Sequence, residues 1–144
     1  MADSKLRDLS TDFAVKVIKM CDGIKGHYSL VNQLERSSTS IGANIHEANY
    51  AHSKADFIAK LQIALKECYE TEYWLELFVK SELLDREIAK DLYNQCGTIR
   101  RMMFACHAND VGCANDDADA NDVCLRAHKG KQTLCEIYKG TPTG

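Results

Sequence analysis

Carboxylate and amide side chains recur at helical spacing in two stretches of the chain. Asn44 and Glu47 are three residues apart in one stretch, and Glu67 and Glu70 repeat that spacing in another. Residues three apart lie on one face of a helix. Ferritin-like bundles bind metal through Glu-x-x-His pairs on facing helices, and this chain has no such pair. The four residues therefore predict a polar network that fixes helix register or an oligomer interface, with no metal bound.

The C-terminal part holds two incomplete metal-site patterns. Asp117, Asp119 and Asn121 match the first ligand positions of an EF-hand loop. Asp122 stands where that loop needs glycine, and His128 stands where it needs a bidentate glutamate. Four possible zinc ligands lack a Cys-x-x-Cys pair, which favours ordinary reduced thiols. These four residues are Cys113, Cys124, His128 and Cys135. We expect neither a metal nor a cofactor.

Catalytic patterns are missing as well. The sequence has no glycine-rich phosphate loop. A Cys–His pair would need a cleft, and His46 and His52 are expected to be exposed or at a helix end. Four cysteines fall on or near apolar stripes and are interpreted as small core residues. They are Cys21, Cys68, Cys96 and Cys106. We expect no enzyme and no small-molecule substrate.

Basic side chains suggest a third kind of chemistry, contact with nucleic-acid phosphates. The candidate residues are Arg36, Lys54, Lys60, Lys66, Arg100 and Arg101. A formal net charge of −3 opposes this interpretation, because nucleic-acid-binding domains are usually basic. Arg100 and Arg101 also suit the dipole at the end of a helix. A ring-shaped oligomer would repeat a weak patch and add its contacts together.

Helices must position all these side chains. The chain has 144 residues, of which 45% are hydrophobic and one is proline, a composition that fits one domain of long helices. Apolar residues at steps of three and four predict a first helix that ends at Gly23 and Gly26. They are Leu6, Leu9, Phe13, Val17, Met20 and Ile24. A second helix is predicted over about 28–50, although its centre is rich in the poor helix formers Ser, Thr and Gly.

The third helix shows the clearest pattern. Ser53 is a good N-cap, with Asp56 three residues later. A seven-residue repeat with alternating steps of four and three, typical of left-handed bundle packing, then covers three heptads. Its members are Phe57, Leu61, Ala64, Cys68, Thr71, Leu75 and Phe78. Further apolar residues lie off this stripe, including Ile63, Tyr73 and Trp74, which indicates a central position or contact with another subunit.

A fourth helix is predicted after a tight corner, with Asp85 as its cap. Its expected inward residues are Leu84, Ile88, Leu92, Ile99, Met102 or Met103, and Cys106. Short connections between the four helices give an all-α, antiparallel up-down-up-down four-helix bundle over 1–107. Residues 108–144 are predicted to be a polar linker and an irregular, weakly structured tail, with a weak helix within 123–138.

The location of the protein follows from two absences in the sequence. The first residues carry charges where a signal peptide needs an apolar run. No stretch approaches the ~20 apolar residues of a membrane span. We expect a cytoplasmic protein with no membrane partner and with free thiols.

Two long runs resemble one known family. Residues 33–48, QLERSSTSIGANIHEA, and residues 57–77, FIAKLQIALKECYETEYWLEL, are similar to the hallmark segments of 23S rRNA-intervening-sequence proteins, formerly called S23 ribosomal proteins. The resemblance covers about 6–106, and the stretch from His107 onward is unlike the family. It implies a small bundle that assembles as a ring-like homopentamer. A similar bundle is the accessory protein of diversity-generating retroelements, which partners a reverse transcriptase and binds nucleic acid.

Residues and resemblance together lead to one functional hypothesis. The chain is expected to be a non-enzymatic, self-associating bundle that serves as an accessory to RNA or DNA, next to a reverse transcriptase or ribosomal RNA. The alternative is a structural protein–protein scaffold without nucleic-acid binding. Salt-sensitive binding of RNA or DNA would separate the two.

Overall fold

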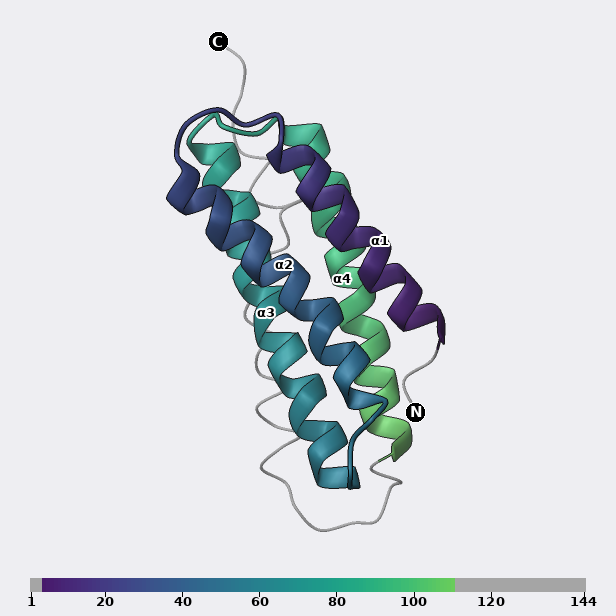
Figure 1. Ribbon diagram of the computed structural model, residues 1–144. Coiled ribbons are helices and arrows are strands. Elements are labelled where there is room, and N and C mark those ends of the chain that lie inside the picture. The colour runs from purple at the N-terminus through teal and green to yellow at the C-terminus, as the bar shows by residue number, and fades with distance from the viewer. Residues whose placement is uncertain (1–3, 111–144) are drawn as a thin grey trace. The chain divides into compact units, whose positions relative to one another are not determined.

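The computed structural model describes residues 4–110, with side chains as far as Cys106. This part of the chain consists of α1 (Ser4–Cys21), α2 (Tyr28–Ala48), α3 (Lys54–Lys80) and α4 (Arg86–Asp110). The helices alternate in direction, and α2 packs between α1 and α3 while α4 closes the bundle against α3 and α1 (Figure 1). The predicted all-α four-helix bundle is confirmed. None of these helices is long and apolar enough to cross a membrane.

The C-terminal predictions lie almost entirely outside the described residues. Residues 108–110 form the end of α4. The polar linker beyond them, the incomplete EF-hand pattern, the four possible zinc ligands and the weak helix within 123–138 lie outside the described range.

Side-chain caps fix two of the connections between helices. The Ser53 hydroxyl accepts the backbone N–H of Asp56 at 3.1 Å, and the Asp56 carboxylate accepts the N–H of His52 at 3.2 Å. Asp85 accepts the backbone N–H groups of Glu87 at 2.9 Å and of Ile88 at 3.3 Å. Each cap satisfies backbone donors that have no partner within the first turn of the helix. Both predicted caps are confirmed.

The Ser- and Thr-rich centre of α2 is helical because small side chains allow close packing. Ser37 and Ser38 are fully buried, and their hydroxyls donate to the carbonyls of Leu34 at 3.2 Å and Glu35 at 3.0 Å. A Cβ added at Gly42 would lie 3.5 Å from the Ser10 hydroxyl of α1. Packing against neighbouring helices therefore offsets the weak helix propensity of this run.

The core confirms most of the predicted inward residues. All seven members of the α3 heptad are buried, as are Leu84, Leu92, Ile99 and Met103 around α4. Cys106 is half-buried. One prediction is wrong: Ile88 is 49% exposed, and Ala89 faces the core in its place. The Asp85 cap starts α4 in a phase that aligns Ala89 with Leu92 and Cys96, and Ile88 is rotated away from that stripe.

Candidate functional site

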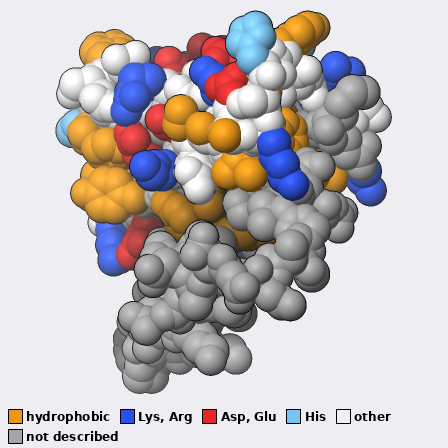
Figure 2. All heavy atoms as spheres, turned by 90° about the horizontal axis from the view of Figure 1, so that it is seen from below, with side chains coloured by type: hydrophobic (Ala, Val, Ile, Leu, Met, Phe, Trp, Pro, Cys, Tyr) orange, Lys and Arg blue, Asp and Glu red, His pale blue; other side chains and the backbone are white. Residues whose placement is uncertain are grey.

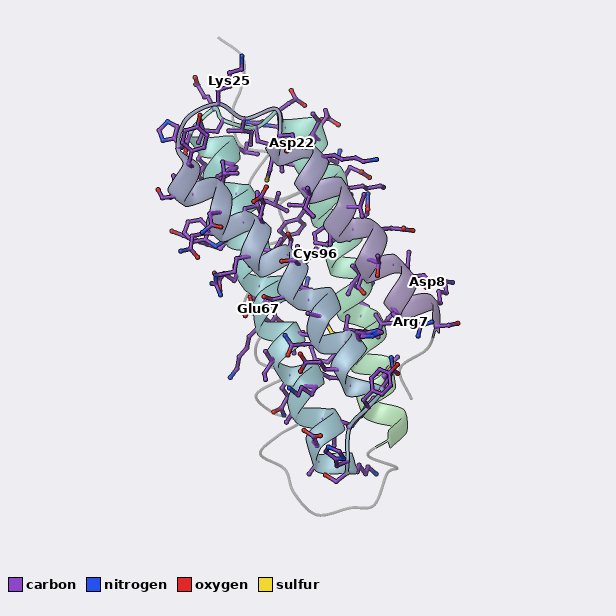
Figure 3. The ribbon with its side chains drawn as sticks, in the orientation of Figure 1. Arg7, Asp8, Asp22, Lys25, Glu67 and Cys96 are labelled. Atoms are coloured by element: carbon purple, nitrogen blue, oxygen red, sulfur yellow. The ribbon has the colours of Figure 1, made fainter. Side chains whose placement is uncertain are left out.

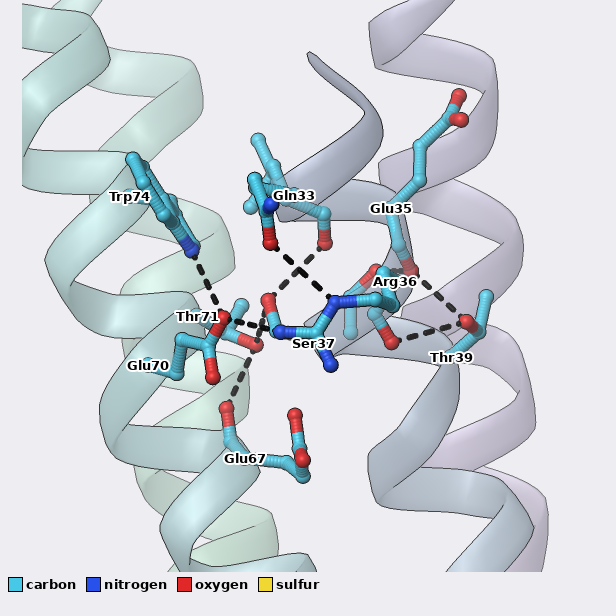
Figure 4. Close-up of polar contacts among 11 residues, drawn as sticks. Gln33, Glu35, Arg36, Ser37, Thr39, Glu67, Glu70, Thr71 and Trp74 are labelled. Atoms are coloured by element: carbon cyan, nitrogen blue, oxygen red, sulfur yellow. Dashed lines mark hydrogen bonds and ion pairs between the residues drawn. The ribbon is translucent and has the colours of Figure 1, made fainter. Parts of the chain in front are cut away.

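Polar side chains line the seam between α2 and α3. Arg36 of α2 forms an ion pair with Glu70 of α3 at 2.7 Å, and the same carboxylate oxygen accepts the Trp74 indole N–H at 3.2 Å (Figure 4). The Arg36 Nε donates to the Gln33 side chain at 3.2 Å. Glu70 is therefore held from both helices, while Arg36 is 51% exposed at its side chain and open to water.

Glu67 lies one turn before Glu70 and has a different environment. Its Oε2 atom is buried and has no hydrogen-bond partner among the described residues. Burial raises the pKa of Glu67, the neighbouring Glu70 carboxylate raises it further, and Arg36 partly opposes the shift. Figure 3 shows Glu67 partway along α3. The ionised form of this side chain is thus disfavoured in the folded chain.

A pair of buried hydroxyls closes the seam beneath these charges. The Thr71 Oγ1 lies 2.9 Å from the Ser37 Oγ and 2.8 Å from the backbone oxygen of Glu67. Both side chains are fully buried. Because buried polar groups cost free energy unless they are paired, this contact favours one register of α2 against α3.

The remaining predicted members of the polar network lie near the C-terminal end of α2. Asn44 donates to the carbonyl of Ser40 in its own helix at 2.8 Å. Glu47 accepts a hydrogen bond from Lys60 of α3, which raises the pKa of that lysine. Among the described residues, no three His, Cys, Asp or Glu side chains are placed to hold a metal ion.

A second ion pair lies in the seam between α3 and α4. Arg100 and Glu72 are 3.2 Å apart, and their side chains are only 15% and 6% exposed. The guanidinium also lies over the Tyr69 ring, 5.1 Å from its centroid. Burial lowers the pKa of Arg100, but the Glu72 carboxylate and Tyr69 raise it above its ordinary value overall.

The sequence analysis does not predict that Glu72 and Tyr69 contact Arg100. The available signal was positional: Glu72 directly follows Thr71 of the core heptad, where a flanking charge needs a partner on a neighbouring helix. The sequence analysis interprets Arg100 as a possible phosphate contact or as a charge that suits the helix dipole. Its geometry shows that it is half of a structural pair.

The same seam contains two buried thiols. The Cys96 Sγ lies 3.6 Å from the backbone oxygen of Cys68, and both residues have no exposed surface. The hydrogen bond to Cys68 and burial raise the pKa of the Cys96 thiol well above its ordinary value. A high pKa suppresses the thiolate, which is the reactive form of cysteine. Cys96 behaves as a small core residue because of its raised pKa and its burial, and Cys68 does so because it is fully buried, as the sequence analysis predicts.

The six basic residues proposed to contact phosphates differ in how far they are already engaged. Arg36, Lys60 and Arg100 are each paired with a glutamate of the bundle. Arg101 donates to the Thr98 hydroxyl at 2.9 Å. Lys54 and Lys66 are exposed, and neither forms an ion pair with another described residue.

Apolar side chains remain on the outer face of α3, which we define by Ile63, Tyr73 and Trp74. Ile63 is 41% exposed and Tyr73 is 57% exposed. The rings of Tyr73 and Trp74 meet edge to face, with centroids 5.0 Å apart. α3 thus has a packed stripe toward the core and a second apolar surface toward solvent, as its sequence indicates.

Comparison with known proteins places this geometry in a family. Residues 2–105 match the family model of the 23S rRNA-intervening sequence protein. The chain belongs to the 23S rRNA-intervening sequence protein family. The match covers α1 to α3 and most of α4, in agreement with the resemblance seen in the sequence.

A solved member supports the same assignment. The chain is similar to a protein of unknown function from the S23 ribosomal protein family of Bacteroides thetaiotaomicron VPI-5482. The two share 41% sequence identity with a TM-score of 0.66, over 70% of this chain and 96% of that one. No curated protein matches the chain. Neither the family description nor that of the solved member names a reaction.

Proposed function

We propose that this member of the family is a non-catalytic, self-associating helical module that forms a ring-shaped homo-oligomer of five copies. The observation that carries this proposal is the outer face of α3, where Tyr73 is 57% and Ile63 is 41% exposed. Isolated exposed apolar residues are common, but an aromatic pair and a further aliphatic residue outside the core stripe of one helix are typical of an interface. A ring also needs two different surfaces on each copy.

The assembled module is proposed to serve as an accessory to a nucleic acid or ribonucleoprotein, such as ribosomal RNA or a reverse-transcriptase complex. Family membership and the exposed Lys54 and Lys66 support this role. Repetition around a ring would multiply weak phosphate contacts.

The second candidate is a protein–protein scaffold that binds no nucleic acid. One observation favours it: three of the six basic residues proposed to contact phosphates already form ion pairs with glutamates of the same chain. A paired basic side chain must give up its partner before it can bind a phosphate, which reduces the net gain.

Light scattering behind a sizing column tests both candidates. The purified chain is measured alone and with RNA, at low and high salt. A discrete oligomer that takes up RNA only at low salt supports the accessory role, whereas an oligomer that ignores RNA supports the scaffold. A monomer at all concentrations would contradict self-association.

A pair of charge substitutions locates the interface. Tyr73→Glu places a carboxylate in the outer face of α3 and should convert the oligomer into monomers. Ile88→Glu is the matched control, because Ile88 is comparably exposed, at 49%, but lies on α4. If both variants assemble like the parent chain, the outer face of α3 is not the contact.

A further inference from the structure

Charge is distributed unevenly along the described bundle. We define the turn end as residues 4–11, 41–66 and 98–106, which lie toward the connection between α2 and α3. Figure 3 shows Asp22 and Lys25 at the opposite end. The turn end contains seven basic and three acidic residues, whereas residues 12–40 and 67–97 contain seven basic and eleven acidic residues. The basic residues of the turn end are Lys5, Arg7, Lys54, Lys60, Lys66, Arg100 and Arg101.

An exposed aromatic side chain lies in the connection between α2 and α3 at this end. Tyr50 lies two residues after the end of α2 and is 72% exposed. The His46 ring meets it edge to face, with centroids 5.5 Å apart. The backbone N–H of Tyr50 donates to the carbonyl of Glu47 at 2.9 Å, and the Ser53 cap fixes the chain just beyond. The tyrosine is therefore presented to solvent from an ordered turn.

Both acidic side chains close to Tyr50 in the sequence already have partners in the bundle. Glu47 is paired with Lys60, and the Asp56 carboxylate accepts the N–H of His52. Lys54 is exposed and has no ion pair within the described residues. Figure 2 views the molecule from this end and shows Lys and Arg side chains spread across the described part of the surface. The turn end therefore presents an exposed lysine four residues after an exposed aromatic ring.

We propose that the turn end binds single-stranded nucleic acid, with Tyr50 stacked on an unpaired base and Lys54 in contact with a phosphate. The inference rests on the nucleic-acid role proposed above and names its site and substrate class. Single-stranded nucleic acid fits because its bases have open π faces, whereas the bases of a duplex are stacked inside it. His46 is a positioning residue that supports the Tyr50 ring.

The chain contains its own control for this site. Tyr28 is as exposed as Tyr50, at 76%, but begins α2 at the acidic end of the bundle. Tyr50→Ala and Tyr28→Ala remove the same side chain from two ends of one molecule. Both positions are at the surface, so both variants should keep the helical circular-dichroism spectrum of the parent.

Fluorescence anisotropy of a labelled oligouridine, measured with the full chain, tests the proposal. Tyr50→Ala should weaken binding about tenfold, a loss of the size of one base–aromatic stack, while Tyr28→Ala and Tyr50→Phe leave the affinity unchanged. Lys54→Gln should reduce the slope of log affinity against log salt by about 0.7, as expected when one phosphate contact is removed from a single strand. A duplex of the same length should bind more weakly and should not respond to Tyr50→Ala.

The outcomes separate this inference from the role on which it rests. If the parent chain binds neither single-stranded nor duplex nucleic acid at about 50 mM salt, the proposed nucleic-acid role is itself wrong. Binding that Tyr50→Ala and Tyr28→Ala reduce equally, or not at all, would overturn the turn-end site while the accessory role stands. Equal sensitivity of duplex and single strand to Tyr50→Ala would also overturn it, because stacking needs an open base.

Discussion

The two seams of α3 use the same kind of ion pair in opposite surroundings. Toward α2, the Arg36 and Glu70 side chains are 51% and 34% exposed, and water screens their attraction. Toward α4, the Arg100 and Glu72 side chains are 15% and 6% exposed, and both charges have lost most of their hydration. Separating Arg36 from Glu70 costs little free energy, because water solvates both charges. Separating Arg100 from Glu72 leaves buried charges without a partner and without water.

The ion pair of the α2–α3 seam can therefore exchange its partner, whereas the ion pair of the α3–α4 seam is part of the folded core. The α2–α3 seam has exposed charges above the buried hydroxyls of Ser37 and Thr71. A ligand or a second copy of the chain could therefore bind Arg36 in place of Glu70, and the buried contact between Ser37 and Thr71 would remain. The α3–α4 seam buries its charges among Tyr69, Tyr93 and the thiols, and burial together with Glu72 raises the pKa of Tyr93 to about 12. Binding functions are therefore expected on the α2–α3 side and at the turn end.

Removal of one partner of the buried pair should have the largest effect. Glu72→Ala leaves the Arg100 guanidinium desolvated and unpaired, and should lower the free energy of unfolding by about 3 kcal/mol. Urea denaturation at one fixed protein concentration measures the loss, since self-association would also change apparent stability.

A double substitution distinguishes the cost of the orphaned charge from lost packing. Glu72→Met combined with Arg100→Met replaces both charges with apolar side chains and should recover most of the stability lost in Glu72→Ala. If the double variant is as unstable as the single one, the loss in Glu72→Ala comes from packing or from the attraction within the pair, and not from an orphaned charge.

Local rules predicted the helices and their ends well. The Ser53 and Asp85 caps and the α3 heptad depend on neighbours within one or a few turns, so the sequence contains the whole signal. The helical centre of α2 was harder, because Ser, Thr and Gly disfavour helices on their own. Its stability comes from close packing of Gly42 on Ser10, a tertiary contact that propensity does not register.

Partners across the bundle could not be predicted in the same way. Glu67, Glu70 and Asn44 were grouped by spacing, but the structure pairs Glu70 with Arg36, leaves a Glu67 oxygen without a hydrogen bond and turns Asn44 back to its own helix. Pairing depends on helix rotation and register, and an error of one residue rotates a side chain by about 100° around the helix. The misplaced Ile88 has the same origin.

Breaking the exposed ion pair between Arg36 and Glu70 should have a smaller effect on stability than breaking the buried one. Arg36→Met removes the ion pair with Glu70 but keeps an apolar stem over the seam, and should lower the free energy of unfolding by less than about 1 kcal/mol. The loss should shrink at high salt, because the pair is open to solvent. Thermal or urea unfolding at low and high salt measures both quantities. A loss as large as that of Glu72→Ala would mean that exposure does not separate the two seams.

Glu67 offers the smallest and most specific test of the α2–α3 seam. Its pKa is raised in the folded chain, so the ionised form destabilises the fold: the cost is absent below the unfolded pKa and grows as pH rises through the folded pKa. Glu67→Gln removes this cost and should raise Tm at neutral pH, on the order of 1–3 °C. The gain should disappear near pH ~4, where the native side chain is itself protonated. The exposed Glu82→Gln is the matched control and should show neither effect. A lower Tm for Glu67→Gln at neutral pH would show that the ionised Glu67 side chain stabilises the fold. Both Glu67 and Glu70 would then contribute to the α2–α3 seam as anions.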